Sequence, residues 1–274
     1  RITDNRVARD AALSPDTGIG EAYMHGRLIV EQGDILDLIR LGGLNRPWES
    51  RQSFIEGAPH KRLFREVMGR IERFNGQHRS KKNVAHHYDL GDRLYDLFLD
   101  ADRQYSCAYF TDADRTLDDA QVDKKAHIAA KLLIRPGDRL LDIGCGWGGM
   151  ALSLAKVAPD VRVTGITLSQ EQLKTARERA AAAGLADRVT FELIDYRQVQ
   201  GQFDRIVSVG MFEHVGPPAY RAFFGTCARL LTDDGVMLLH TIGRMGGPGV
   251  TDKWTAKYIF PGGYSPALSE IVRG

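Results

Sequence analysis

The sequence predicts an α/β protein whose larger part is a parallel, doubly wound sheet. Two observations predict this fold. From residue 139 onward, short apolar segments alternate with longer segments of helical periodicity, which is the pattern of helices connecting parallel strands. The first apolar segment, Leu140–Ile143, runs directly into four glycines within six residues. In such sheets a glycine-rich turn after a buried strand either lets a ligand approach the bare backbone or serves packing alone, and its context decides between the two.

The 274 residues suffice for one large domain and an accessory region. We predict a small N-terminal α+β lobe over residues 1–75 and a catalytic domain over residues 76–274. Because the alternation of strands and helices fades after His240, we expect this domain to be incomplete at its C-terminus.

A basic amphipathic helix is expected at the end of the first lobe. Between His60 and Lys82, eight Lys and Arg side chains stand against two Glu, for a local net charge of +6, and apolar residues recur at helical spacing. Such a helix either packs on the core with a solvated basic face or lies against anionic lipid headgroups. Both interpretations stay open at this point.

A further helix is predicted from about Leu117 to Leu133, ahead of the sheet. Thr116 is suited to its N-cap, with Asp119 near the third position of the helix. Its apolar stripe is predicted to comprise Val122, Ala126, Ala129 and Leu133.

The elements of the sheet follow in regular order. In the second helix, Ser169 and Gln172 have the spacing of a capping box. The predicted strands are Arg139–Ile143, Val161–Ile166, Val189–Leu193, Arg205–Val209 and Val236–His240. The predicted helices are Trp147–Val157, Glu171–Ala183 and Pro217–Leu231.

The composition excludes several classes of protein. Hydrophobic residues make up 43% and charged residues 26%, which is ordinary for a globular protein, and no apolar run reaches the length that crosses a bilayer. The three cysteines are too few and too far apart for a disulfide framework or a zinc site, so we predict a cytoplasmic protein without a metal. A net charge of only +2 argues against a nucleic-acid partner.

The glycine turn differs from that of a dinucleotide-dependent dehydrogenase. Those enzymes show G-x-G-x-x-G and an acidic residue at the end of the second strand. Here the second strand ends in Thr167, and an acidic residue, Asp142, instead precedes the glycines on the first strand. Asp195 and Tyr196 follow the third strand, where methyltransferases that bind S-adenosylmethionine hold adenine. For Asp195 an ordinary turn residue is the alternative.

Six motifs together resemble the cyclopropane-fatty-acyl-phospholipid synthases and the related mycolic acid methyltransferases. The resemblance runs from about residue 18 to about residue 270, and it implies a Rossmann-like class I fold of S-adenosylmethionine-dependent methyltransferases. The motifs are Tyr105–Phe110 (YSCAYF), Leu141–Gly149, Gly165–Ser169, Phe203–Gly216 (FDRIVSVGMFEHVG), Leu238–Gly243 (LLHTIG) and Lys257–Gly263 (KYIFPGG).

The resemblance also implies the residues of a cofactor site. The cofactor of that family is S-adenosylmethionine. By similarity, it would be held by Tyr105, Ser106, Asp142, Gly144, Cys145, Gly146, Trp147, Gly148, Thr167, Leu168, Ser169, Gln172, Asp195 and Tyr196.

The family further binds bicarbonate near the transferable methyl group. The matching positions here are Cys107, Glu213, His240 and the backbone at Ile242, whereas a tyrosine ligand from the family's C-terminal region has no counterpart. Taken alone, Cys107 and His240 would more often be core residues, and Glu213 could cap the next helix. With the motifs, we expect Cys107, Glu213 and His240 to surround one small anion, whereas His214 is assigned no role.

The implied activity is transfer of a methylene group from S-adenosylmethionine to the cis double bond of an unsaturated acyl chain in a membrane phospholipid. A cyclopropane ring would form with bicarbonate as the general base. The protein would associate peripherally with the inner face of the cell membrane, and a homodimer is compatible with this. Two alternatives stay open, namely a C-methyltransferase giving methyl-branched lipid and a non-catalytic protein that binds lipid or S-adenosylmethionine.

Overall fold

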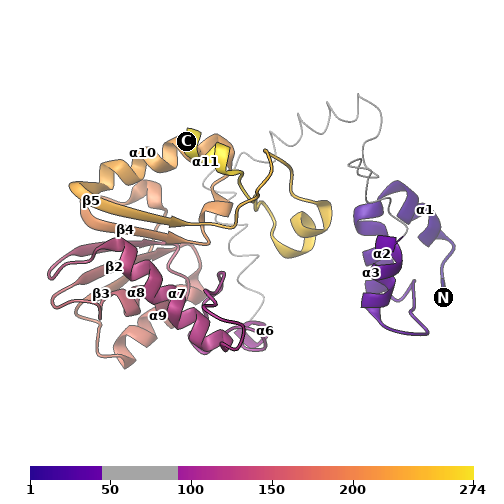
Figure 1. The fold of residues 1–274 in the computed structure, drawn as a ribbon, viewed down its shortest axis with the longest axis horizontal. Helices are drawn as coiled ribbons and strands as arrows, with labels where there is room; N and C mark the ends of the chain where they lie inside the picture. The colour runs from indigo at the N-terminus through magenta and orange to yellow at the C-terminus, as the bar shows by residue number, and fades with distance from the viewer. Residues whose placement is uncertain (45–91) are drawn as a thin grey trace. The chain divides into compact units, whose positions relative to one another are not determined.

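The computed structural model describes residues 1–44 and 92–274 of the chain. These residues divide into two units (Figure 1). The first unit contains residues 1–44 and 251–260, and the second contains residues 92–250 and 261–274. The domain boundary expected near residue 75 and the basic segment of residues 60–82 lie outside the described residues.

The first unit is helical in the residues that are described. Helices α1 (Arg6–Leu13) and α2 (Pro15–Met24) pack together, and α3 (Ile35–Leu44) follows. A π-helical turn, Thr255–Ile259, is joined to α2 by an ion pair of 2.7 Å between Lys257 and Glu21. Within residues 1–44, β-structure is confined to one antiparallel bridge between Ile2 and Leu28. No helix among the described residues is long and apolar enough to span a membrane.

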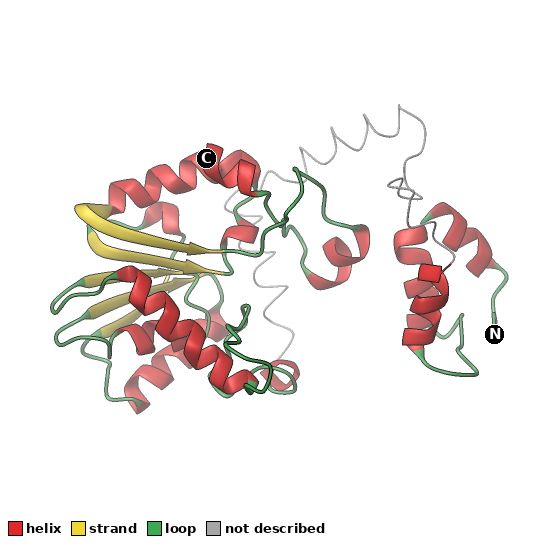
Figure 2. Ribbon diagram, viewed as in Figure 1, coloured by secondary structure: helices red, strands yellow, loops and turns green. Residues whose placement is uncertain are grey.

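The second unit is built on five parallel strands in the order β3-β2-β1-β4-β5 (Figure 2). The strand order reverses between β1 and β4, and in sheets of this type ligands bind beyond the carboxyl ends at such a point. The bounds of β1 and β3 agree with the prediction at both ends. The strands are β1 (Arg139–Ile143), β2 (Arg162–Thr167), β3 (Val189–Leu193), β4 (Phe203–Val209) and β5 (Leu231–His240).

Helices cover both faces of this sheet (Figure 1). Alternate side chains of β1 point to opposite faces, so Leu140 joins one core and Leu141 and Ile143 join the other. The first core is completed by α7 (Leu117–Leu132), α8 (Gly149–Leu154) and α9 (Gln170–Ala182), and the second by α10 (Tyr220–Leu230) and α11 (Leu268–Arg273). A short helix, α6 (Asp92–Tyr95), precedes the sheet.

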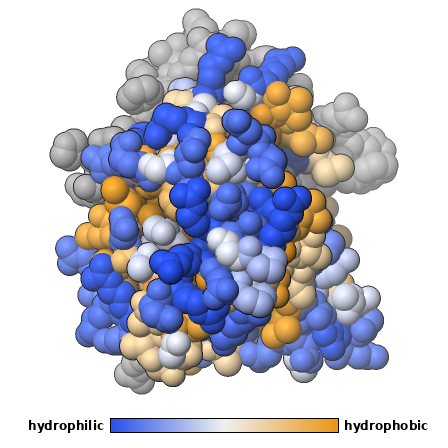
Figure 3. All heavy atoms as spheres, turned by 90° about the vertical axis from the view of Figure 1, so that its left-hand side faces the viewer, coloured by the Kyte–Doolittle hydropathy of each residue, from blue (hydrophilic) through white to orange (hydrophobic). Residues whose placement is uncertain are grey.

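The ends of the sheet differ in what they present. Figure 3 shows the side at which the strands begin, and hydrophilic side chains cover most of this face, with hydrophobic residues in smaller patches. The glycine turn lies at the other end, where the strands finish. We therefore expect the ligand site at the carboxyl ends of the strands.

Both predicted N-caps form, with one difference. The Thr116 hydroxyl accepts a hydrogen bond from the Asp119 amide (3.2 Å), and the Ser169 hydroxyl accepts one from the Gln172 amide (3.3 Å). The second half of the capping box is absent, because the Gln172 side chain accepts a bond from the Thr167 hydroxyl instead (2.8 Å). That bond ties the start of α9 to the end of β2.

The apolar stripe predicted for α7 is wrong. Val122, Ala126 and Leu133 are exposed and Ala129 is half-buried. The helix instead buries a face that contains two polar residues, and a search for apolar periodicity cannot detect such a face. Its buried residues are Ala120, Gln121, Lys124, Ile128 and Leu132.

We predict that Leu132→Ala destabilises the second unit far more than Leu133→Ala. Leu132 is 0% exposed and lies in the core under α7, whereas its neighbour is 64% exposed. Truncation of a buried leucine costs about 2–5 kcal/mol, because a transfer term and a cavity term add. The exposed position should change stability by less than about 0.5 kcal/mol. Urea unfolding followed by circular dichroism measures both. Equal losses would contradict this orientation of α7.

Candidate functional site

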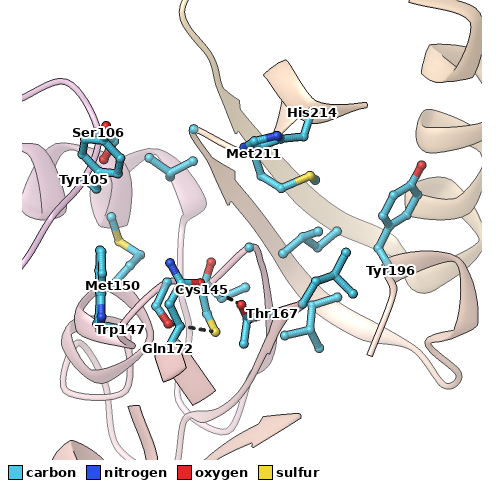
Figure 4. Close-up of a pocket in the computed structure, with 18 of the residues that line it drawn as sticks. Tyr105, Ser106, Cys145, Trp147, Met150, Thr167, Gln172, Tyr196, Met211 and His214 are labelled. Carbon is cyan, nitrogen blue, oxygen red and sulfur yellow. Dashed lines mark hydrogen bonds between the residues drawn. The ribbon is translucent and has the colours of Figure 1, made fainter. Parts of the chain in front are cut away.

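A cavity lies at the carboxyl ends of the central strands, and its space, with the open solvent at its mouth included, is about 1120 Å³. Figure 4 shows how its walls are arranged. Tyr105 and Ser106 stand on one side and Tyr196 on the opposite side, with Thr167 and Gln172 between them, joined by their hydrogen bond. The cavity therefore collects residues from segments far apart in the sequence.

Most of the predicted cofactor residues line this cavity. Gly148 and Ser169 do not line it. Gly148 is the N-cap of α8, and Ser169 is the N-cap of α9. The residues that do line it are Tyr105, Ser106, Asp142, Gly144, Cys145, Gly146, Trp147, Thr167, Leu168, Gln172, Asp195 and Tyr196.

The glycine turn makes the wall of the cavity beside β1. Gly144 adopts a φ of +84°, and a Cβ at this position would lie 2.7 Å from the Met211 side chain. Gly146 adopts a φ of +53°, and no atom lies within 4 Å of where its Cβ would be. Because Gly146 also lines the cavity, a ligand can occupy the space that a side chain would fill. The Gly144 and Cys145 amides both donate to the Ile166 carbonyl, which ties the turn to β2.

Asp142 brings a buried negative charge to the cavity. Its side chain is 2% exposed, and Oδ2 has no hydrogen-bond partner among the described residues. Burial raises the pKa of Asp142 to about 7. An uncompensated carboxylate in such a place is stabilised by a cation, so the site suits a positively charged ligand such as a sulfonium or an ammonium group.

Asp195 lies across the cavity and is held by Arg197. The Arg197 Nε and Nη2 atoms donate to the two carboxylate oxygens at 2.7 and 2.6 Å, and the Arg197 amide donates at 3.0 Å. Burial raises the pKa of the neighbouring Tyr196 to about 12, so its phenol stays neutral. This pair offers a neutral aromatic ring beside a charge-balanced carboxylate, which suits a planar polar ring such as adenine.

A network around Asp102 fixes the segment that carries Tyr105 and Ser106. Asp102 forms ion pairs with Lys125 and Arg179, and accepts a bond from Gln104 Nε2 (3.0 Å). Burial opposes ionisation, but the two cations outweigh it and lower the pKa of Asp102. Arg179 also donates to the Trp147 carbonyl (2.9 Å), so this segment is joined directly to the glycine turn.

A second cavity, about 890 Å³ with the open solvent at its mouth included, is lined by two of the predicted anion ligands. Cys107 and His240 both line it, whereas Glu213 lines neither cavity. The Glu213 Oε1 atom accepts a bond of 2.6 Å from the Ile242 amide. The structure thus shows two associations among the four residues. Cys107 and His240 line one cavity, and Glu213 bonds to the Ile242 amide, two residues after His240. That all four surround one anion stays a prediction.

Two buried polar atoms in these pairs are available to a ligand. Within the described residues, Glu213 Oε2 and His240 Nδ1 have no hydrogen-bond partner. Burial raises the pKa of Glu213 against the opposing Ile242 amide, and burial lowers the pKa of His240. An acceptor and a donor of this kind fit bicarbonate, which can both donate and accept hydrogen bonds.

Several residues that line the first cavity were not predicted from the sequence. His214 is buried and lines the first cavity, although no role was assigned to it. The FDRIVSVGMFEHVG motif was the available signal for Met211, His214 and Val215, whereas nothing in the spacing pointed to Arg103, Gln104, Met150 or Arg197. No cluster of three or more His, Cys, Asp or Glu side chains in residues 1–44 and 92–274 could hold a metal ion.

Comparison with known proteins places the chain among relatives. The family described as mycolic acid cyclopropane synthetase matches residues 75–274. The cyclopropane-fatty-acyl-phospholipid synthase of Escherichia coli is 42% identical over 270 residues, which is 98% of this chain and 66% of the relative. The chain thus spans just under two thirds of that protein's length.

Solved structures agree with this placement. The cyclopropane synthase MmaA2 from Mycobacterium tuberculosis superposes with a TM-score of 0.66 at 36% identity, covering 70% of this chain and 72% of that one. The mycolic acid cyclopropane synthase CmaA1, complexed with SAH and CTAB, superposes with a TM-score of 0.65 at 39% identity, over the same shares. The fold is therefore the Rossmann-like class I methyltransferase fold that the sequence predicted.

We predict that Asp142→Asn removes a pH dependence of stability. The pKa of the wild-type carboxyl is higher in the folded chain, about 7, than in the unfolded chain, about 4. The contribution of this carboxyl to the free energy of unfolding is therefore highest below about pH 4 and falls as the pH rises towards about 7, by up to about 1.4 kcal/mol per pH unit. At about pH 8 the variant should therefore melt at a higher temperature than the wild type, and near about pH 5 the difference should shrink. Calorimetric melting without ligand tests this, with the exposed Asp187→Asn as control. Parallel pH profiles for wild type and Asp142→Asn would contradict it.

Proposed function

This chain belongs to the mycolic acid cyclopropane synthetase family, and from that membership we propose that it transfers a methylene group from S-adenosylmethionine to the cis double bond of an unsaturated phospholipid acyl chain, forming a cyclopropane ring. The observation that carries the proposal is the first cavity, in which the glycine turn, Asp142 and Tyr105–Ser106 come together. The name of the E. coli relative, a fatty-acyl-phospholipid synthase, supports the substrate class.

Residues of the first cavity would hold the cofactor. S-adenosylmethionine supplies a methyl group on a positively charged sulfur. Asp142 provides a buried negative charge for a cationic ligand, and Gly146 leaves the backbone bare at the cavity wall. CmaA1, which is 39% identical to this chain, has been solved in complex with SAH, and this supports a cofactor of this kind here. The Asp102 network would keep the Tyr105–Ser106 wall in place against the glycine turn.

Exclusion of water is the second task of the cavity walls. An alkene is a weak nucleophile, so the reacting atoms must be held in line and away from solvent. Tyr95 is buried and packs edge-on against both Tyr105 (5.4 Å between ring centroids) and Trp147 (5.0 Å). Around a bound substrate, aromatic side chains at this wall would limit the access of water, and their faces would stabilise a positive charge that develops in the acyl chain.

We extend the proposal to bicarbonate as the base. Cys107, Glu213, His240 and the Ile242 amide would hold it, and it would supply a base for the proton lost on ring closure. The unpartnered Glu213 Oε2 and His240 Nδ1 atoms support this assignment. A lowered pKa keeps His240 neutral at neutral pH, so one ring nitrogen can donate while the other accepts.

We predict that the chain incorporates label from methyl-labelled S-adenosylmethionine into cis-unsaturated phospholipid vesicles. Mass spectrometry of the released acyl chains should show a gain of one carbon and two hydrogens, in a ring. Gly146→Val should lower the affinity for S-adenosylhomocysteine by roughly tenfold or more, because its side chain fills the cavity at a positive φ. Gly225→Ala, a helical glycine with open space around it, is the control.

The same experiment separates the alternatives. A methyl-branched product would identify a C-methyltransferase in place of a ring-forming enzyme. Tight binding of S-adenosylhomocysteine without any transfer of label would favour a non-catalytic binding protein. Failure to bind S-adenosylhomocysteine at all would overturn the assignment of the cavity.

We also propose that the protein acts peripherally at the inner face of the cell membrane. The basic segment of residues 60–82, with a net charge of +6, would meet anionic headgroups, and each basic residue contributes up to about 1 kcal/mol there. Arg70→Glu combined with Arg73→Glu should reduce sedimentation with anionic liposomes and leave the weak sedimentation with neutral liposomes unchanged. Equal binding of the wild type to both kinds of vesicle would refute this mode of association.

A further inference from the structure

Helix α7 directs two buried polar side chains at the segment that walls the first cavity. Lys124 is 3% exposed, and its Nζ donates to the Ser106 hydroxyl at 2.7 Å. Gln121 is equally buried, and its Nε2 donates to the carbonyls of Gln104 (3.1 Å) and Ser106 (3.0 Å). Three hydrogen bonds thus hold residues 104–106 onto one face of α7.

This segment belongs to both cavities at once. Gln104, Tyr105 and Ser106 line the first cavity, and the next residue, Cys107, lines the second. Lys124 itself also lines the second cavity, with His240. The side chain of Lys124 therefore runs between the wall of one site and the interior of the other.

An ammonium group in this position has an energetic cost. Burial lowers the pKa of Lys124 to about 8, and Lys125 adds repulsion, while Asp100 and Asp102 give partial compensation. A buried charge is weak evidence for stability, because the cost of its desolvation offsets much of what its partners supply. An apolar side chain at this position could also pack α7 against the sheet. Only a side chain with a donor, such as Lys124, can bond to the Ser106 hydroxyl.

We propose that Lys124, assisted by Gln121, is a positioning residue of the cofactor site, which acts through Ser106 to hold residues 104–107 where the two cavities meet. Lys124 is absent from the lining of the first cavity and acts on it through its partner. The inference rests on the proposed function, because it assumes that S-adenosylmethionine occupies the first cavity.

The test is the affinity of the 274-residue chain for S-adenosylhomocysteine, measured by titration calorimetry. Lys124→Met keeps the length of the side chain and removes its charge and donors. We expect about tenfold weaker binding, which is the scale of a lost hydrogen bond from a charged donor. Lys124→Arg, which keeps the charge and the donors, should restore part of the affinity. Lys174→Met on α9, an exposed lysine, is the matched control.

A double-mutant cycle shows whether Lys124 acts through Ser106. If it does, Lys124→Met combined with Ser106→Ala should bind about as weakly as the weaker single variant, because both substitutions break the same bond. Additive losses would assign Lys124 to general stability and overturn the proposal. So would no rescue by Lys124→Arg, or an affinity of Lys124→Met equal to that of the wild type.

A further variant covers the case in which Lys124→Met does not fold. Gln121→Leu leaves the charge in place and removes two of the three bonds to the segment, so it should also weaken binding when measured below its own melting temperature. Wild-type affinity in Gln121→Leu would then overturn the proposal. If the wild-type chain itself does not bind S-adenosylhomocysteine, the proposed function fails. If the wild type binds and the variants bind equally well, only the role of Lys124 fails.

Discussion

The path of the backbone from Gly144 to Gly148 sets the geometry of the whole site. Gly144, Gly146 and Gly148 all have positive φ, whereas the residues between them, Cys145 and Trp147, are buried. A Cβ at Gly144 would press on Met211, and one at Gly148 would press on Phe191, so the turn fits closely between neighbouring elements. Only Gly146 faces open space. The turn thereby presents bare backbone to the cavity while its alternate side chains anchor it in the core.

The fold was predictable where local patterns agree with burial. Strands β1 and β3 end where the sequence predicts. β1 is a short run buried at four of its five residues, and it ends at the glycine turn. β3 lies at the edge of the sheet and buries only Val189 and Phe191, in the alternation of a half-buried strand. The buried face of α7 was not predictable, since Gln121 and Lys124 lie inside and Val122 and Leu133 outside. A polar side chain is buried when a partner satisfies it. The partners are the Gln104 and Ser106 carbonyls for Gln121 and the Ser106 hydroxyl for Lys124, and they lie 15 to 18 residues away in the sequence.

The site was predictable in a similar, partial way. The motifs identified residues that contact the cavity through the glycine turn, β2 and the end of β3, because these positions follow from one connected stretch of sheet. Arg197 was missed because its role depends on folding back two residues to chelate Asp195. The expected gathering of Cys107, Glu213 and His240 is a statement about tertiary distance, and sequence motifs carry no such information. Among the described residues, Cys107 and His240 line one cavity and Glu213 bonds to the Ile242 amide, so the gathering round one anion stays a prediction.

The two cavities differ in the sign of their buried charge, and this difference decides which kind of ligand each of them favours. Asp142 places an uncompensated carboxylate at the first cavity, and its raised pKa records the cost of keeping it ionised there. Lys124 places an ammonium at the second cavity, where the lowered pKa records the cost of burying a positive charge. A cationic ligand in the first cavity relieves the first cost, and an anion in the second relieves the other. Because residues 104–107 form part of both walls, a substitution that displaces this segment is expected to disturb both sites together.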